Sequence, residues 1–277
     1  MAGILRENLL AVGTIMKNIL YLCLLLLIFP LCKTELNSVH IFYYGHSCFE
    51  FYFEGYRILI DPFTPEWFDY ELPRGQFDMV FSTHDAKDHA SFEGLNIDKL
   101  FLASGAADEF KMISNGKLSI QKGRITEYIN KKKFTFRSVA SYHDEVQGQK
   151  NGVNGIVCFD FCGIKIVHMG DIGHVLTETQ VNKIGRVDIL MIPVDSYYII
   201  ELEKAREIVK QLSPTLVIPM HYKTEKSSNK AYENDLENFA RMFDTVSECR
   251  DYHIVINEQM LNVNPRLFIL EYLKKID

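Results

Sequence analysis

The sequence predicts an α+β fold in which short strands outnumber helices. Three observations support this. Short apolar runs separated by turn-forming residues recur through most of the chain after residue 37, as expected for strands. Only two stretches, 201–212 and 234–243, show the spacing of an amphipathic helix. A His or Asp follows closely after several of the apolar runs, which suggests that one edge of a sheet carries a functional site.

The first predicted strands form a meander. Residues 39–44, 48–53 and 57–60 are apolar runs broken by Gly45 and Gly55, and a fourth run at 78–82 leads directly into Thr83 and His84. Residues 91–133 are less regular. We expect short helices and strands there, with a helix beginning near Gly105.

The later part of the chain repeats the pattern of strands that lead into potential ligands. Residues 134–142 predict a strand that ends at His143, and 156–161 with 164–168 predict a hairpin turned at Cys162 and Gly163. Residues 187–193 and 215–219 predict buried strands, the second leading to His221. The helices at 201–212 and 234–243 lie among these strands, and two short strands at 254–256 and 267–270 complete the chain.

The N-terminal segment differs from the rest in composition. Residues 19–32 carry no charge and follow Lys17, but they are shorter than the ~20 apolar residues that a membrane-spanning helix needs. Such a run suits the apolar region of a signal peptide. We therefore predict a signal peptide or membrane anchor over 1–33 and a folded domain over 34–277. The protein would be exported (periplasmic or secreted) or membrane-anchored, with any membrane association through residues 19–32.

Charge and length limit the other possibilities. The 277 residues carry a net charge of −6, and no basic block stands out beyond the three lysines at 131–133. Nucleic acid is therefore not favoured as a partner. The chain left after residue 33 is long enough for one large domain or two fused halves, and the composition does not indicate an oligomeric state.

The central motif reads Thr-His-Asp-Ala-Lys-Asp-His over residues 83–89. Because this segment follows a predicted strand, a tight turn would let His84, Asp88 and His89 point the same way. Imidazole and carboxylate side chains are the ligands that suit zinc, with manganese or iron as alternatives. His46, His143, Asp171 and His221 also follow predicted strands, so the sequence predicts a metal centre at a sheet edge.

These residues, together with the run Gly45-His46-Ser47-Cys48-Phe49, resemble the metallo-β-lactamase superfamily. Within it they are similar to the branch of predicted metal-dependent hydrolases that includes L-ascorbate-6-phosphate lactonase. The resemblance implies a four-layer αβ/βα sandwich, the metallo-β-lactamase fold, that divides near residue 130 into two similar halves. It also implies a small-molecule substrate and six metal ligands: His84, Asp88, His89, His143, Asp171 and His221.

One ligand of the superfamily motif HxHxDH is missing, because Ala86 occupies the position of its second His. The resemblance therefore implies one firmly bound zinc ion, held by Asp88, His89, His221 and the bridging Asp171. The other site, left with His84, His143 and Asp171, would be weak or empty.

Three functions are consistent with this pattern. The first is a metal-dependent hydrolase that acts on a small phosphorylated, lactone or phosphodiester substrate through a metal-bound hydroxide. Asp88 and Asp171 would orient the water and move its proton. His174 and His46 would face the substrate or support a ligand from behind, with a hydrogen-bonded structural role as the alternative for each. The second is a degenerate relative that binds a metal or ligand without turnover, because of Ala86. The third is a phospholipase-type activity at a membrane surface, like the distant N-acyl-phosphatidylethanolamine phospholipase D group.

Three further residues are expected near the site. Asp61 would hold a ligand His by a hydrogen bond. Asn154 would line the pocket. Asp195 belongs to a run of bulky residues, 195–198, where relatives usually have small Gly residues, so the pocket would differ in shape from theirs.

Overall fold

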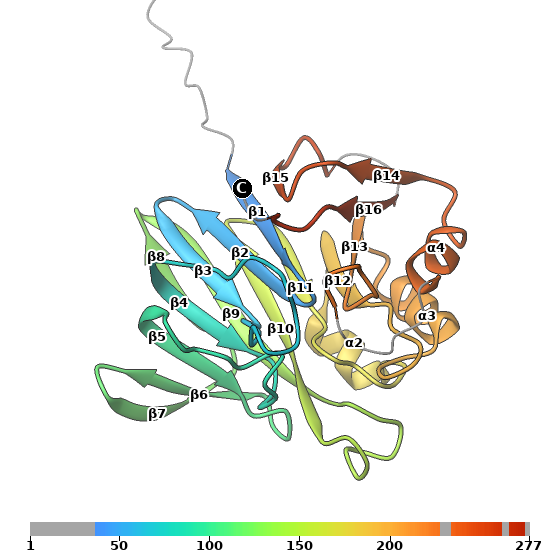
Figure 1. The fold of residues 1–277 in the computed structure, drawn as a ribbon. Helices are drawn as coiled ribbons and strands as arrows, with labels where there is room; N and C mark the ends of the chain where they lie inside the picture. The colour runs from blue at the N-terminus through green and yellow to red at the C-terminus, as the bar shows by residue number, and fades with distance from the viewer. Residues whose placement is uncertain (1–36, 228–233, 262–265, 275–277) are drawn as a thin grey trace, which may run out of the picture. The chain divides into compact units, whose positions relative to one another are not determined.

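Two sheets of eight strands each account for most of the chain described by the computed structural model, which covers residues 37–227, 234–261 and 266–274 (Figure 1). The first sheet has the order β15-β1-β2-β3-β4-β5-β6-β7 and the second the order β14-β16-β13-β12-β11-β10-β9-β8. The strands of the first sheet are β1 (Ser38–Gly45), β2 (Cys48–Phe53), β3 (Tyr56–Ile60), β4 (Gln76–Ser82), β5 (Asn96–Ala103), β6 (Glu109–Ser114), β7 (Lys117–Lys122) and β15 (His253–Asn257). Those of the second are β8 (Ile125–Ile129), β9 (Lys132–Tyr142), β10 (Val153–Phe161), β11 (Ile164–His168), β12 (Ile189–Pro193), β13 (Leu216–Met220), β14 (Val246–Cys249) and β16 (Arg266–Leu270).

The two halves of the chain share one topology. In the first half, β1, β2 and β3 form an antiparallel meander, and β4 and β5 then add in parallel. In the second half, β9, β10 and β11 form the meander, and β12 and β13 add in parallel. The second sheet begins with β8, close to the division near residue 130 that the sequence predicted. β15 is an exception to the division, because it returns from the C-terminal part to pair with β1.

Aromatic side chains fill the space between the sheets. Phe51 on β2 lies with its ring centroid 5.2 Å from that of Phe159 on β10, and Phe81 on β4 lies 5.0 Å from the rings of both Phe136 and Phe159. All four are buried. Each such side chain contributes roughly 1.5–3 kcal/mol through removal of its apolar surface from water. This interior fixes the two sheets face to face and so sets the relative positions of their edges.

The helices lie outside the second sheet. They are α2 (Glu178–Ile184), α3 (Leu202–Leu212) and α4 (Asp235–Ala240). Figure 1 shows them on the side of that sheet away from the first, where α2 contacts β9 and α3 contacts β12. Both predicted helices are thus confirmed in position, and the predicted sandwich of sheets is confirmed as well. The sequence did not predict α2, which begins with a capping box between Thr177 and Gln180.

The expectation for residues 91–133 was partly wrong. The structure describes no helix in this stretch, and the segment after Gly105 leads into β6 instead. β6 and β7 form a hairpin turned at Asn115 and Gly116, both with positive φ (50° and 70°), as in a tight Asn-Gly hairpin turn. That dipeptide, flanked by alternating side chains, was the signal that sequence reasoning overlooked.

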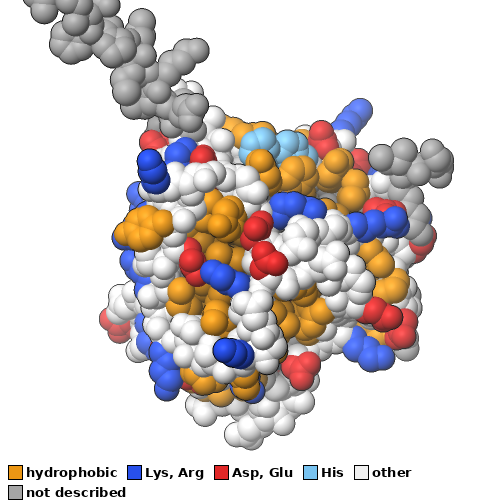
Figure 2. Space-filling model, turned by 90° about the vertical axis from the view of Figure 1, so that its left-hand side faces the viewer, with side chains coloured by type: hydrophobic (Ala, Val, Ile, Leu, Met, Phe, Trp, Pro, Cys, Tyr) orange, Lys and Arg blue, Asp and Glu red, His pale blue; other side chains and the backbone are white. Residues whose placement is uncertain are grey.

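The outer face of the first sheet carries no helix in the part of the chain that the structure describes. Figure 2 shows His and hydrophobic side chains gathered on this face. His40 on β1 lies with its Nδ1 3.0 Å from Nε2 of His253 on β15, and the ring of Phe42 stacks on His253 at 4.3 Å. Cross-strand ring pairs of this kind stabilise a sheet face without a covering layer.

The predicted boundary between 1–33 and 34–277 lies in a segment outside the described residues, as does the apolar run 19–32. Signal peptide, anchor and export therefore stay predictions. Within the described ranges, no helix has the length and apolar character needed to span a bilayer.

The aromatic interior gives a direct test of the fold. Phe81 is fully buried and contacts aromatic rings of both sheets. Phe81→Ala is expected to lower the free energy of unfolding by about 3–5 kcal/mol, because it leaves a cavity that the sheets cannot close. Tyr128→Ala, at a side chain that is 69% exposed on β8, is the matched control and should change it by less than about 0.5 kcal/mol. Urea unfolding of both variants measures the difference, and equal losses would contradict this account of the core.

Candidate metal centre

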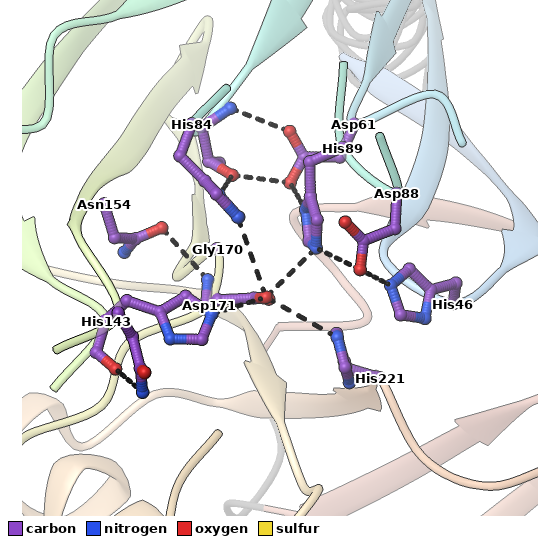
Figure 3. A network of polar contacts seen from close by, with 12 residues as sticks. His46, Asp61, His84, Asp88, His89, His143, Asn154, Gly170, Asp171 and His221 are labelled. Carbon is purple, nitrogen blue, oxygen red and sulfur yellow. Dashed lines mark hydrogen bonds and ion pairs between the residues drawn. The ribbon is translucent and has the colours of Figure 1, made fainter. Parts of the chain in front are cut away.

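The potential ligands come from the ends of strands in both sheets. His46 follows β1 and His84 follows β4 in the first sheet, while His143 follows β9 and His221 follows β13 in the second. Asp171 comes three residues after β11. Because the two sheets pack face to face, these ends meet at one edge of the sandwich, and Figure 3 shows their side chains converging there.

The backbone is strained at two of these ligands and at Asp61, which lies beside them. His46, Asp61 and His221 have φ values of 54°, 50° and 55°, which are uncommon for residues other than Gly. The backbone N–H of His221 donates to the carbonyl oxygen of His46 at 2.8 Å, so the ends of β13 and β1 are joined across the two sheets. Strain of this kind persists where the surrounding structure enforces it, and it concentrates at functional sites.

Asp171 is the hub of the cluster. Its Oδ2 lies 3.1 Å from Nε2 of both His89 and His143, 3.5 Å from Nε2 of His221 and 3.8 Å from Nε2 of His84 (Figure 3). The carboxylate is almost completely buried. The resemblance implied that Asp171 bridges two metal ions, and this bridging role stays a prediction.

Seven side chains form two groups with the geometry of metal sites, and within each group the donor atoms all lie within 4.8 Å of one another. One group contains His84, His143 and Asp171, and the other contains His46, Asp88, His89 and His221. The structure therefore brings together all six ligands inferred from the sequence and adds His46. Sequence reasoning had placed His46 facing the substrate, although its position just after a strand was the same signal that the other ligands gave.

A buried carboxylate orients one ligand of the four-donor group. Asp61 Oδ2 accepts a hydrogen bond from Nδ1 of His89 at 2.7 Å, which leaves Nε2 as the free donor atom. Asp61 is itself held by the backbone N–H and the hydroxyl of Thr83, both at 2.8 Å. The role expected for Asp61 from the sequence is thus the one in which the structure places it.

Asp195 lies close to a second ligand, in an ion-pair contact and not in a hydrogen bond of the kind that joins Asp61 to His89. Its Oδ2 lies 3.3 Å from Nδ1 of His221, and its Oδ1 accepts the backbone N–H groups of Tyr197 and Tyr198 at 3.0 and 3.1 Å. The carboxylate is fully buried. Sequence reasoning saw Asp195 only as bulk near the pocket. Its partnership with His221 joins residues 26 positions apart and depends on how β12 and β13 are placed side by side.

The backbone of Asp171 is fixed from behind by Asn154. Asn154 Oδ1 accepts the N–H of Asp171 at 3.0 Å, and its Nδ2 donates to the carbonyl of Met169 at 2.8 Å. Gly170 is required here, since it has a φ of 55° and a Cβ would lie 2.2 Å from Asn154 Oδ1. The sequence predicted that Asn154 lines the pocket. Its side chain is instead buried beneath the site and does not line the cavity.

The pKa values of neighbouring groups in the cluster are shifted in opposite directions. Burial and then the nearby His221 lower the pKa of His46 to about 3, and burial together with His89 lowers that of His84 to about 4. Burial works against a charged His89 as well, but the carboxylates of Asp171, Asp61 and Asp88 outweigh it and raise its pKa well above the usual range. Burial would raise the pKa of Asp171, yet the imidazoles of His89 and His221 hold it far below its ordinary value. Asp171 is therefore ionised at neutral pH.

The residues present fit a metal ion. Several buried donor atoms in the cluster lack any hydrogen bond in the structure: His46 Nε2, His89 Nε2, His143 Nδ1, His221 Nδ1, His221 Nε2 and Asp171 Oδ1. A buried polar atom without a partner costs about 1–3 kcal/mol. Because Nε2 of His46, His89 and His221 lie in one group with a carboxylate oxygen, one divalent cation would satisfy them together.

A cavity of about 530 Å³ opens onto the cluster. This is within the range of about 300–1,000 Å³ found for small-molecule sites. Its lining combines ligands of both groups with aromatic and aliphatic side chains: His46, Trp67, Phe68, His84, Asp85, Ala86, Asp88, His143, Asn151, Asp171, Tyr198, Ile199 and His221. The metal groups therefore form part of the wall of a substrate-sized pocket.

Two other His residues form backbone contacts instead of lining the pocket. Nε2 of His174 accepts the N–H of Tyr142 at 3.2 Å, and Nδ1 donates to the carbonyl of Val175 at 2.8 Å. His168 is buried and donates from Nε2 to the carbonyl of Ser47 at 2.9 Å. The catalytic role predicted for His174 stays a prediction.

A profile of the β-lactamase superfamily domain matches residues 40–221, which contain every member of the two metal groups. The chain belongs to this superfamily. It is similar to a UPF0173 metal-dependent hydrolase of Thermoplasma acidophilum, with 27% identity over 197 residues that cover 68% of this chain and 85% of the relative. A UPF0173 protein of Pyrococcus furiosus is 25% identical over 75% of this chain and 95% of its own length.

The fold is similar to that of a Thermotoga maritima protein described as a candidate zinc-dependent hydrolase of the metallo-β-lactamase superfamily. The TM-score is 0.60 at 25% sequence identity, over 84% of this chain and 98% of the other. The superfamily predicted from the sequence is thus confirmed. No comparison distinguishes the lactonase branch, which stays a prediction.

The two orienting carboxylates can be tested together. Asp61→Asn and Asp195→Asn keep the shape of the side chain but weaken the hold on His89 and His221. Each is expected to reduce the affinity for zinc by about 10- to 100-fold. Asp188→Asn is the matched control. Asp188 is also buried, and it accepts the backbone N–H of Lys165 at 2.8 Å. It precedes β12, whereas Asp195 follows that strand. Competition with a chromophoric chelator measures affinity, and unchanged affinity in both site variants would contradict these roles.

Proposed function

We propose that this metal-dependent hydrolase of the β-lactamase superfamily cleaves a small phosphorylated, lactone or phosphodiester substrate with water. One observation carries the proposal: seven side chains capable of ligating metals, Asp171 among them, form two groups, and six of the seven line a cavity of about 530 Å³. Such a cavity brings a substrate within reach of a metal centre, which is the arrangement that metal-assisted hydrolysis needs.

The four-donor group, His46, Asp88, His89 and His221, is the proposed site of one firmly bound ion, zinc by the chemistry of its donors, with manganese or iron as alternatives. His84, His143 and Asp171 would hold a second ion more weakly. A bound zinc ion lowers the pKa of its water to ~7 and so supplies hydroxide at neutral pH.

The three residues that the sequence indicated as catalytic enter this proposal with different tasks. Asp88 has a side chain that is 20% exposed and lines the cavity, so its Oδ2 can accept a proton from water and exchange it with solvent. Asp171, whose side chain is 3% exposed, orients the water from its fixed place among the imidazoles. His174 acts as a positioning residue, since it holds the backbone of Tyr142 directly before His143.

The non-catalytic alternative depended on Ala86. Ala86 lines the cavity beside both groups, and Asp85, its neighbour, is exposed at the rim and belongs to neither. The loss of one imidazole thus concerns the three-donor group. The four-donor group has its full set of protein ligands without position 86, which supports turnover with a single ion.

Metal content is the first measurement. The purified full-length chain is expected to hold about one zinc ion, and Ala86→His is expected to raise this toward two, because a third imidazole would complete the weaker group. Elemental mass spectrometry after exhaustive dialysis gives the ratio. Ala86→Gln is the matched control, being similar in size without a ring donor. Two tightly held ions in the unmodified chain would show that the ligand assignment is incomplete.

Hydrolysis tests the function itself. The zinc-loaded chain should hydrolyse at least one member of a panel containing a phosphomonoester, a phosphodiester and a lactone, and chelation should abolish this. Asp88→Asn is expected to lower kcat by about 10²–10⁴-fold, the usual contribution of a positioned proton-transfer group. Glu203→Gln, at an exposed carboxylate of α3, is the control. No turnover above that of the chelated chain would overturn the proposal.

A further inference from the structure

We infer that the pocket selects a neutral ester or lactone with an apolar, ring-sized body, and that it disfavours phosphorylated substrates. This inference rests on the proposed hydrolase function and narrows its substrate class. Three features of the cavity carry it: apolar walls beside both metal groups, a lining without cations, and the space left at Ala86.

The walls come from two segments far apart in the sequence. Trp67 and Phe68 belong to the segment between β3 and β4, and the ring of Phe68 lies 4.3 Å from that of His46. Tyr198 and Ile199 belong to the segment after β12 and line a second, adjoining cavity together with His143. Each metal group therefore has apolar side chains next to it.

Two of these side chains leave part of their surface open to water at the cavity. Trp67 is 43% exposed and Tyr198 is 44% exposed, and both line the cavity. Large apolar surface is left open to water at ligand sites more often than elsewhere. A substrate body that packs between these rings would remove that surface from water, at roughly 25 cal/mol for each Å² buried.

The lining formed by the described residues contains carboxylates and imidazoles but no permanently cationic side chain. Among the described residues, the acidic side chains that line the cavity are Asp85, Asp88 and Asp171, and neither Lys nor Arg contributes. Phosphate groups are commonly bound by Arg or Lys. The carboxylates of Asp88 and Asp171 balance one divalent ion, so a centre with a single ion has no excess positive charge for a phosphate dianion. Asp85 at the rim adds repulsion.

Nearby cations do not change this balance. Lys87 pairs with Glu66 at 3.3 Å, and Lys204 pairs with Glu145 and Glu201 at 2.6 and 2.9 Å. The adjoining cavity contains Lys150, but Asp144 and the two glutamates line it as well. Within the part of the chain that the structure describes, the approach to the centre is therefore not cationic.

Ala86 supplies space beside the centre. Where the superfamily motif has an imidazole, this chain presents a methyl group to the cavity. The space belongs to a cavity whose lining also includes Trp67, Phe68, Tyr198 and Ile199, and it suits the ring or acyl portion of an ester. The same substitution that weakens one metal group thus enlarges the site for an apolar substrate.

The reaction is an ordinary ester hydrolysis. The oxygen of water bonds to the carbonyl carbon, and the bond from that carbon to the alkoxy oxygen breaks with its electron pair staying on the oxygen. The proton lost by the water passes through Asp88 Oδ2 to the leaving alkoxide. A lactone gives a hydroxy acid, and an ester gives an acid and an alcohol. The new carboxylate is repelled by Asp85 and Asp88, which favours its release.

The sequence supplies a binding probe that needs no turnover. The chain has a single Trp, which is Trp67 on the pocket wall. The full-length chain, kept metal-free with a chelator, would be titrated with phenyl butyrate and with phenyl phosphate, which share the aromatic body and differ in charge. We expect a saturable change in Trp67 emission with the ester, and at least about tenfold weaker binding of the phosphate, a difference of ~1.4 kcal/mol.

Two variants at one position separate packing from folding. Tyr198→Ala should weaken ester binding by roughly tenfold, whereas Tyr198→Phe should retain it, because the ring and not the hydroxyl forms the wall. The side chain of Tyr198 is exposed, and neither substitution changes the hydrogen bond that the backbone N–H of residue 198 donates to Asp195. Both variants should therefore fold. Equal binding of ester and phosphate, or an ester titration that leaves Trp67 emission unchanged, would overturn the inference.

Turnover by the zinc-loaded chain distinguishes the two proposals. We expect kcat/KM for phenyl butyrate to exceed that for phenyl phosphate by at least about 100-fold, and Tyr198→Ala to raise KM while kcat changes little. Faster hydrolysis of the phosphate would overturn the substrate class and leave the hydrolase proposal standing. Hydrolysis of neither compound, nor of any member of the wider panel, would overturn the hydrolase proposal itself.

Discussion

A buried carboxylate surrounded by imidazoles is the constraint on which the site depends. Asp171 Oδ2 has four His Nε2 atoms within 3.8 Å, and a negative charge in that position would be very costly without positive charge close by. In the chain without an ion, the raised pKa of His89 supplies part of that charge. A divalent cation supplies it more completely and satisfies the donor atoms left without hydrogen bonds. The buried negative charge of Asp171 and the arrangement of the ligand atoms therefore both favour a divalent cation at this site.

The scaffold that holds this cluster is built from strand ends. Five of the seven candidate ligands follow a strand closely, and Asp88 and His89 lie in the loop after β4. These strands come from two sheets locked together by aromatic packing such as that of Phe81 with Phe136. The hydrogen bond from His221 N to His46 O joins the sheets at the site itself. Asp61 then holds the ring of His89 by a hydrogen bond, and Asp195 lies 3.3 Å from the ring of His221. A ligand set spread over 176 residues of chain, from His46 to His221 inclusive, is made rigid in this way.

The pocket combines a four-donor group with an altered position beside it. Ala86 stands where the superfamily motif has an imidazole, and it lines the cavity together with members of both metal groups. Residues 195–200 place Tyr198 and Ile199 at the cavity, and Asp195 secures that segment through the backbone N–H groups of Tyr197 and Tyr198. One buried carboxylate thus couples the position of a metal ligand to the shape of the pocket wall. Substitutions in this segment would affect metal affinity and substrate choice together.

The sequence by itself determined the superfamily, the strand-rich sandwich and six members of the cluster, because ligands after strands are a local pattern that survives without knowledge of tertiary contacts. It also identified Asp61 as the partner of a ligand His. It did not predict the β6–β7 hairpin, where the Asn115-Gly116 signal was outweighed by an expected helix. Only the tertiary structure decided the grouping of ligands, the inclusion of His46 and the partnership of Asp195 with His221. The physical reason is that each of these depends on the register and packing of strands distant in sequence, which bring side chains together at distances that no local pattern encodes.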